Sequence, residues 1–251
     1  MLFVKLIVSA TEASSGLLDR LFAHGGVLER WQTLIAGGLA IIAALIGGAY
    51  VSRQTTRMHQ LAAEERRREF GAARAALPLT LSTLSDYADH CVTALREILA
   101  QANGEAIPQN VSRQTIPTIP PGVVNDLVGL ARHGNESLYR AIAVILIELQ
   151  VQASRMRSLW RDLERDGLVV TVSNVEDYII HTAEVYARAT ALFGFARGES
   201  ENVPNHLTYE QIRSALNLLG VYRLEYERIH ATAESRYRRR ALREEATYVS
   251  M

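Results

Sequence analysis

The sequence predicts an all-α fold: one N-terminal transmembrane helix continues into a stalk, which leads to a cytoplasmic helical bundle of four or five helices. Three observations support this prediction. An uncharged apolar run occupies residues 31–52, between Arg30 and Arg53. A charged, alanine-rich segment of strong helix formers follows, with no helix breaker until Pro78. Farther along, apolar residues recur at helical spacing, and 48% apolar residues in a chain of 251 are enough for a buried core.

The run at 31–52 is the predicted transmembrane helix. Its 22 residues match the roughly 20 residues that cross about 30 Å of hydrocarbon as a helix. Trp31 and Tyr50 bracket the run where aromatic rings favour lipid headgroups. A buried soluble helix and a cleaved signal peptide are the alternatives, and the length and position of the run favour a retained anchor. Residues 1–30 then form a short juxtamembrane segment.

The orientation of the span is predicted from the basic residues on either side of it. Three precede the run and five follow it closely: Lys5, Arg20 and Arg30, then Arg53, Arg57, Arg66, Arg67 and Arg68. Because basic residues concentrate on the cytoplasmic side of a span, this asymmetry places the C-terminal domain in the cytoplasm.

Small residues recur every four positions within the span, at Ala36, Ala40, Ala44 and Gly48. Such a stripe lets two helix backbones approach closely, so a homo-oligomer through the span is one interpretation. The other is that alanine and glycine are simply common in membrane helices. Both remain open at the level of sequence.

Residues 53–77 form the predicted helical stalk, and residues 78–243 the predicted bundle. The first bundle helix follows Pro78, with apolar residues at three- and four-residue intervals. A Pro-rich connection at 103–121 comes next and is either a linker or an ordered loop. Residues 244–251 are a tail.

The remaining bundle helices are predicted from their caps and periodicity. Asn135 is a candidate cap for a long helix that ends before Gly167, and 168–172 is an extended stretch too isolated to imply a sheet. The predicted capping boxes pair Ser173 with Glu176 and Thr208 with Gln211. The predicted helices span 122–132, 135–166, 173–197 and 208–243.

The stretch LERWQTLIAGGLAIIAALIGG at 28–48, the arginine-rich stalk and AARAALPLTLSTLSDYA at 72–88 resemble a group of uncharacterised proteobacterial membrane proteins. The resemblance covers the anchor, the stalk and the first bundle helix. It implies a single-pass protein of the bacterial inner membrane, and it implies nothing about chemistry.

Missing residue types exclude several mechanisms. Lys5 is the only lysine and precedes the span, so Walker-A phosphate binding, protein-kinase chemistry and a pyridoxal Schiff base lack their lysine in the bundle. Cys91 is the only cysteine, which excludes an intrachain disulfide and multi-thiolate zinc sites. We expect Cys91 to be a small buried residue rather than a nucleophile.

Carboxylate–histidine pairs are the candidate metal ligands. Asp177 and His181 are four residues apart on a predicted helix, and Glu227 and His230 are three apart on another. Such pairs more often stabilise a helix surface, and a di-iron bundle needs two Glu-x-x-His motifs where this chain has one. We therefore expect no cofactor, and metal binding at these four residues is the alternative.

Arginines near the end of the last predicted helix form the best candidate contact surface: Arg236, Arg238, Arg239, Arg240 and Arg243. They suit an anionic headgroup or an acidic partner, whereas nucleic acid is not expected because no reading motif accompanies them. The expected partners are therefore the lipid bilayer, an unknown protein and a second copy of the chain. The favoured function is non-enzymatic partner binding or scaffolding at the membrane, and the alternative is a metal-binding or enzymatic bundle.

Overall fold

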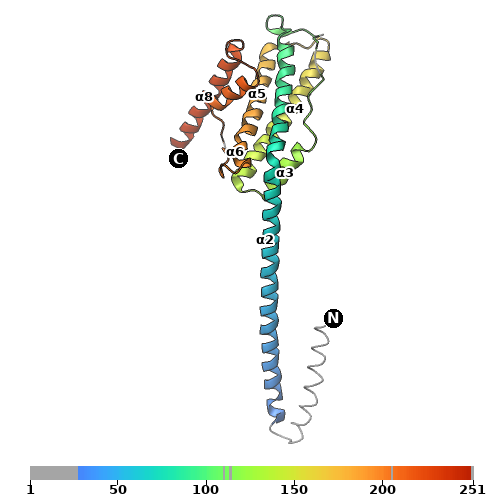
Figure 1. Ribbon diagram of the computed structural model, residues 1–251, viewed down its shortest axis with the longest axis vertical. Helices are drawn as coiled ribbons and strands as arrows, with labels where there is room; N and C mark the ends of the chain where they lie inside the picture. The colour runs from blue at the N-terminus through green and yellow to red at the C-terminus, as the bar shows by residue number, and fades with distance from the viewer. Residues whose placement is uncertain (1–27, 110, 113–114, 205, 250–251) are drawn as a thin grey trace. The chain divides into compact units, whose positions relative to one another are not determined.

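The computed structural model describes residues 28–109, 111–112, 115–204 and 206–249, and the side chains within 36–243 of these ranges. The predicted all-α fold is confirmed (Figure 1). The helices are α2 (Leu28–Leu99), α3 (Val123–His133), α4 (Glu136–Glu164), α5 (Val172–Ala191), α6 (Phe193–Ala196), α7 (Tyr209–Leu218) and α8 (Glu227–Val249). The predicted juxtamembrane segment lies outside the described residues as far as residue 27.

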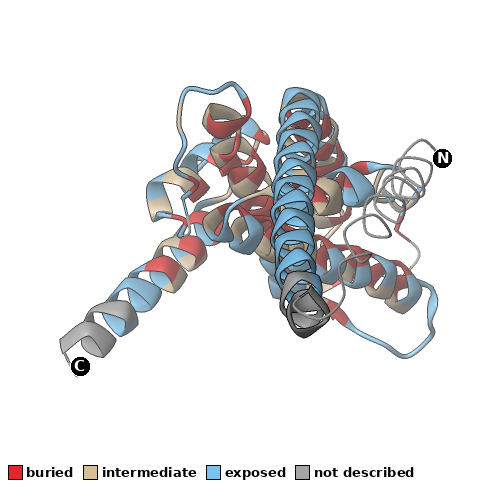
Figure 2. Cartoon of the chain, turned by 90° about the horizontal axis from the view of Figure 1, so that it is seen from below, coloured by how far each residue is buried: buried red, intermediate tan, exposed pale blue. Residues whose placement is uncertain are grey.

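The chain forms two compact units, Met1–Glu64 and Glu65–Met251. In the first, α2 carries large apolar side chains that are all more than half exposed, including Leu39, Leu45 and Ile46. Figure 2 shows this run of exposed residues along α2. Within the described part of the chain, α2 is the one helix long and apolar enough to cross a membrane. None of its apolar window is buried, unlike the core helix of a soluble protein.

In the second unit, the C-terminal part of α2 belongs to the bundle. Leu81, Leu84 and Leu95 are fully buried in one core with residues of the other helices. Pro78 lies inside α2, so the boundary predicted there does not interrupt the helix. A proline costs an internal helix about 3 kcal/mol, and the burial of the leucines that follow offsets this cost.

The described part of the Pro-rich connection is an ordered loop. Its strand β1 (Ala106–Ile107) pairs antiparallel with β2 (Val170–Thr171), so the extended stretch after α4 has a partner that its isolation in the sequence did not suggest. Ile107 and Val111 are buried in the core. The described part of the connection therefore packs against the bundle as an ordered loop.

The caps explain where three helices begin. The Asn135 carboxamide oxygen accepts a hydrogen bond from the Leu138 amide at 2.9 Å, as predicted for α4. The capping box of Thr208 and Gln211 opens α7, also as predicted. The box predicted at Ser173 and Glu176 is wrong: Thr171 caps α5, and the Glu176 carboxylate instead accepts hydrogen bonds from Arg228.

The last predicted helix, 208–243, is two helices in the structure. Helix α7 ends at Leu218, and Gly220 follows with a φ of +73°, a left-handed conformation that favours glycine. Helix α8 begins at Glu227 and runs to Val249, into the predicted tail. The separate α7 brings the helices of the bundle to six, including the end of α2 and excluding the four-residue α6.

Candidate functional site

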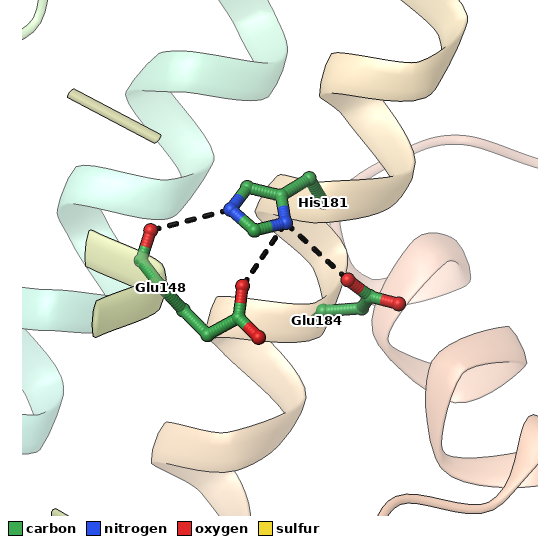
Figure 3. Close-up of side chains that lie close together, drawn as sticks. All are labelled: Glu148, His181 and Glu184. Atoms are coloured by element: carbon green, nitrogen blue, oxygen red, sulfur yellow. Dashed lines mark hydrogen bonds and ion pairs between the residues drawn. The ribbon is translucent and has the colours of Figure 1, made fainter. Parts of the chain in front are cut away.

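A Glu–His–Glu cluster connects α4 with α5 (Figure 3). The Nδ1 atom of His181 lies 3.1 Å from Glu148 Oε2 and 3.3 Å from Glu184 Oε2. The other ring nitrogen, Nε2, lies 3.2 Å from the backbone carbonyl oxygen of Glu148. His181 and Glu184 are buried, whereas the Glu148 side chain is 21% exposed. The cluster is thus enclosed by the bundle except on the side of Glu148.

A tyrosine of α8 completes the surroundings of the cluster. The Tyr237 hydroxyl donates a 2.8 Å hydrogen bond to Glu184 Oε1, which leaves Oε2 facing His181. Burial works to raise the pKa of Glu184, but the hydrogen bonds from His181 and Tyr237 outweigh it and lower that pKa below its usual value. Glu184 is therefore a buried carboxylate that stays ionised at neutral pH.

Helix geometry explains why these side chains meet. His181 and Glu184 are three residues apart on α5, so they lie on one face of that helix. Glu148 lies on α4 directly before the buried Leu149. A carboxylate beside a helix core is costly unless it finds a partner, and α5 supplies one.

The four predicted metal ligands do not come together. His181 lies in the cluster, but the Asp177 carboxylate pairs with Arg236 at 2.8 Å on the surface. Glu227 is exposed at the start of α8. His230 is fully buried, with Nε2 at 2.8 Å from the Val221 carbonyl oxygen. The predicted spacing thus identified one member of the cluster and missed Glu148 and Glu184.

A second polar contact lies beside the cluster, with Gln152 one turn after Glu148 on α4 and Thr182 directly after His181 on α5. The buried Gln152 amide donates to the Thr182 hydroxyl at 2.5 Å, and that hydroxyl donates to the Tyr178 carbonyl at 2.8 Å. Burial raises the pKa of Cys91 to about 12. Cys91 is therefore a neutral buried thiol, which fits the packing role expected for it rather than that of a nucleophile.

The arginines of the predicted contact surface lie along α8, and several have partners on the protein. Arg236 contacts Asp177, Arg238 contacts Glu234 at 3.1 Å, and the Arg240 guanidinium lies 5.6 Å from the centre of the Tyr237 ring. The exposed members of the set are Arg238, Arg239, Arg240 and Arg243.

In the first unit, the predicted packing stripe at Ala36, Ala40, Ala44 and Gly48 is exposed along α2. The Tyr50 side chain is 65% exposed. Trp31 lies within α2, and the structure describes its backbone only.

No protein-family model, curated protein or solved structure matches this chain. The resemblance to uncharacterised proteobacterial membrane proteins accordingly stays a prediction.

Proposed function

We propose that this chain is a membrane-anchored protein that binds a protein partner, or scaffolds an assembly, at the cytoplasmic face of the bacterial inner membrane, without catalysis of its own. The observation that carries the proposal is the exposed apolar run of α2. Leu39, Ile42 and Leu45 are 63%, 54% and 68% exposed, and they belong to a window with no buried residue. Soluble proteins rarely leave such a continuous apolar surface in water, so a lipid bilayer is its natural environment.

The composition of the bundle supports a binding role over catalysis. The bundle contains no lysine, so it lacks the residue that several catalytic mechanisms need. Burial keeps the Cys91 thiol neutral. Among the described residues, the core consists mainly of aliphatic side chains. A bundle of this kind can bind a partner through its surface. We assign the exposed arginines of α8 as the contact surface, and the partner that complements them has an acidic face.

A crosslinking experiment in native membranes tests the proposal. The full chain carries a tag after Met251, and one variant replaces the exposed arginines of α8 with glutamine: Arg238, Arg239, Arg240 and Arg243. A matched variant removes four exposed arginines elsewhere on the bundle: Arg132, Arg140, Arg161 and Arg165.

We expect the parent chain and the matched variant to crosslink one protein partner in comparable yield. The α8 variant should recover it at a yield reduced at least tenfold, because close charge pairs across an interface contribute on the order of 1.5 kcal/mol or more each. Equal recovery by all three chains would remove α8 as the contact surface. Recovery of the chain alone would reduce the function to self-assembly, and substrate turnover by the purified chain would overturn the non-enzymatic proposal.

A further inference from the structure

The strongest feature that the proposed function leaves unused is the cluster of Glu148, His181 and Glu184. It brings two carboxylates to the same nitrogen of one buried histidine, at 3.1 and 3.3 Å. The donor atoms of the three side chains all lie within 4.8 Å of one another.

Electrostatics requires a cation at the centre of this cluster. If Nδ1 were a bare nitrogen, its lone pair would face two carboxylate oxygens, and three electron-rich atoms would repel one another in a region of low dielectric constant. Either a proton on Nδ1 or a metal ion between the three donors removes the repulsion.

The position of the ring fits a metal ligand. Nε2 faces the carbonyl oxygen of Glu148 at 3.2 Å, so Nε2 carries a proton and the ring is held with Nδ1 toward the carboxylates. A histidine that ligates a metal usually donates its other N–H in this way. Tyr237 plays the corresponding part for Glu184, because it binds Oε1 and leaves Oε2 toward the centre.

The distances also suit a small divalent ion. A tetrahedral ion with bonds of about 2.1 Å separates its ligand atoms by roughly 3.4 Å. The Nδ1–oxygen separations of 3.1 and 3.3 Å are close to that value. One imidazole and two carboxylates form a nitrogen–oxygen set that zinc accepts, and three protein ligands leave a fourth position.

We propose that Glu148, His181 and Glu184 bind a divalent transition-metal ion of the zinc class, which links α4 to α5. Binding replaces the proton on Nδ1, and that proton leaves to solvent. The 21% exposure of the Glu148 side chain provides the route by which the ion enters and identifies the side on which the fourth ligand lies. This inference is independent of the membrane anchor and of the partner surface on α8.

Zinc alone is the probe for the test. The full chain is purified in detergent, stripped with a chelator, incubated with excess Zn²⁺ and desalted, and the bound metal is measured by mass spectrometry. We expect about one zinc ion per chain and a rise in the melting temperature of about 5 °C. The same preparation with Co²⁺ should show the visible absorption of a tetrahedral nitrogen–oxygen site.

Three variants make the test specific. Glu148→Gln preserves the shape of a partly exposed side chain, so it should fold and lose at least nine-tenths of the bound zinc, and His181→Gln should do the same. His90→Gln is the matched control, because His90 is exposed on α2 with Asp86 four residues before it and lies outside the cluster. The control should bind zinc as the parent does.

The results that overturn the proposal are equally definite. A folded parent chain that retains no zinc after desalting would assign the central cation as a proton. Zinc retained by Glu148→Gln at the parent level would place the metal elsewhere on the chain. Circular dichroism of each variant verifies the fold, and if His181→Gln fails to fold, Glu148→Gln alone decides.

Discussion

At the scale of single residues, the Tyr237 hydroxyl has a measurable role in stability. It donates to a buried carboxylate, and replacing tyrosine by phenylalanine removes only this oxygen. We expect Tyr237→Phe to lower the free energy of unfolding by about 1.5–3 kcal/mol at pH 7, the range for hydrogen bonds to charged groups. Urea unfolding in detergent, followed by circular dichroism, measures it. Tyr222→Phe, at a side chain 52% exposed, is the control and should change stability by less than about 0.5 kcal/mol.

The effect of Tyr237→Phe on the free energy of unfolding should depend on pH. Because the pKa of Glu184 is lowered in the folded chain, its stabilising contribution is present above the ordinary value of 4.5 and is lost as the pH falls through the folded pKa. With both chains stripped of metal by a chelator, the difference between Tyr237→Phe and the parent should therefore shrink when unfolding is measured at progressively lower pH. A difference that stays constant from neutral to acid pH would mean that the substitution acts through packing instead.

Residue-scale prediction from sequence succeeded where the partners are local and failed where they are distant. The cap at Asn135 and the box at Thr208 depend on atoms three residues away, and both were predicted. His181 was identified as a candidate ligand by its spacing from Asp177, but its partner on α4 is 33 residues away in the chain. A spacing rule on one helix cannot find Glu148, although a carboxylate beside a buried helix face signals that a partner exists.

At the scale of elements, the turn between α7 and α8 depends on Gly220. Its φ is +73°, and a Cβ atom there would lie 2.7 Å from Nη1 of Arg96. We expect Gly220→Ala to lower the free energy of unfolding by about 1–2 kcal/mol, since alanine is strained in the left-handed region and the arginine has to move.

Gly71→Ala is the matched control for that turn. Gly71 lies inside α2 with no atom within 4 Å of a built Cβ, so alanine should stabilise the helix by about 0.5–1 kcal/mol. The opposite signs are measured by thermal or urea unfolding of the two variants. Destabilisation by both would show that alanine is poorly tolerated for reasons other than the left-handed turn.

Element boundaries show where local sequence signals were overridden. Pro78 is a helix breaker by local preference, but buried residues on both sides keep α2 continuous. Between residues 208 and 243 the pattern is helical on both sides of the turn, and the isolated Gly220 was not recognised as a C-terminal stop. Tertiary packing keeps α2 continuous through Pro78, and the left-handed backbone conformation of Gly220 separates α7 from α8.

At the scale of the whole molecule, the two units differ in where they place apolar side chains. The second unit buries its large aliphatic residues in one core. The first leaves them exposed along α2 in the described residues up to Glu64. The order of residues predicted this contrast, because a long uncharged run is typical of a membrane span, whereas apolar residues at three- and four-residue spacing are typical of a helix with one buried face. No described residue buries the exposed run, and the partner that we propose for it is the bilayer.

Charge placed in the exposed run tests that proposal directly. Ile42→Arg combined with Leu45→Arg puts two cations near the middle of the apolar window, at a cost of about 2.5–3.5 kcal/mol each for membrane insertion. We expect the parent chain to resist alkaline extraction from membranes and the double variant to be released. Met58→Arg with Leu61→Arg is the control, because these side chains are 64% and 63% exposed, like those in the window, but lie in the charged segment.

The control pair should stay with the membrane, since lipid discriminates against charge by depth and not by exposure in water. If both pairs are released equally, the effect is a general loss of apolar surface and the run is not a span. If neither pair is released, the chain is held at the membrane by other contacts, and the exposed run of α2 then calls for a protein partner to cover it.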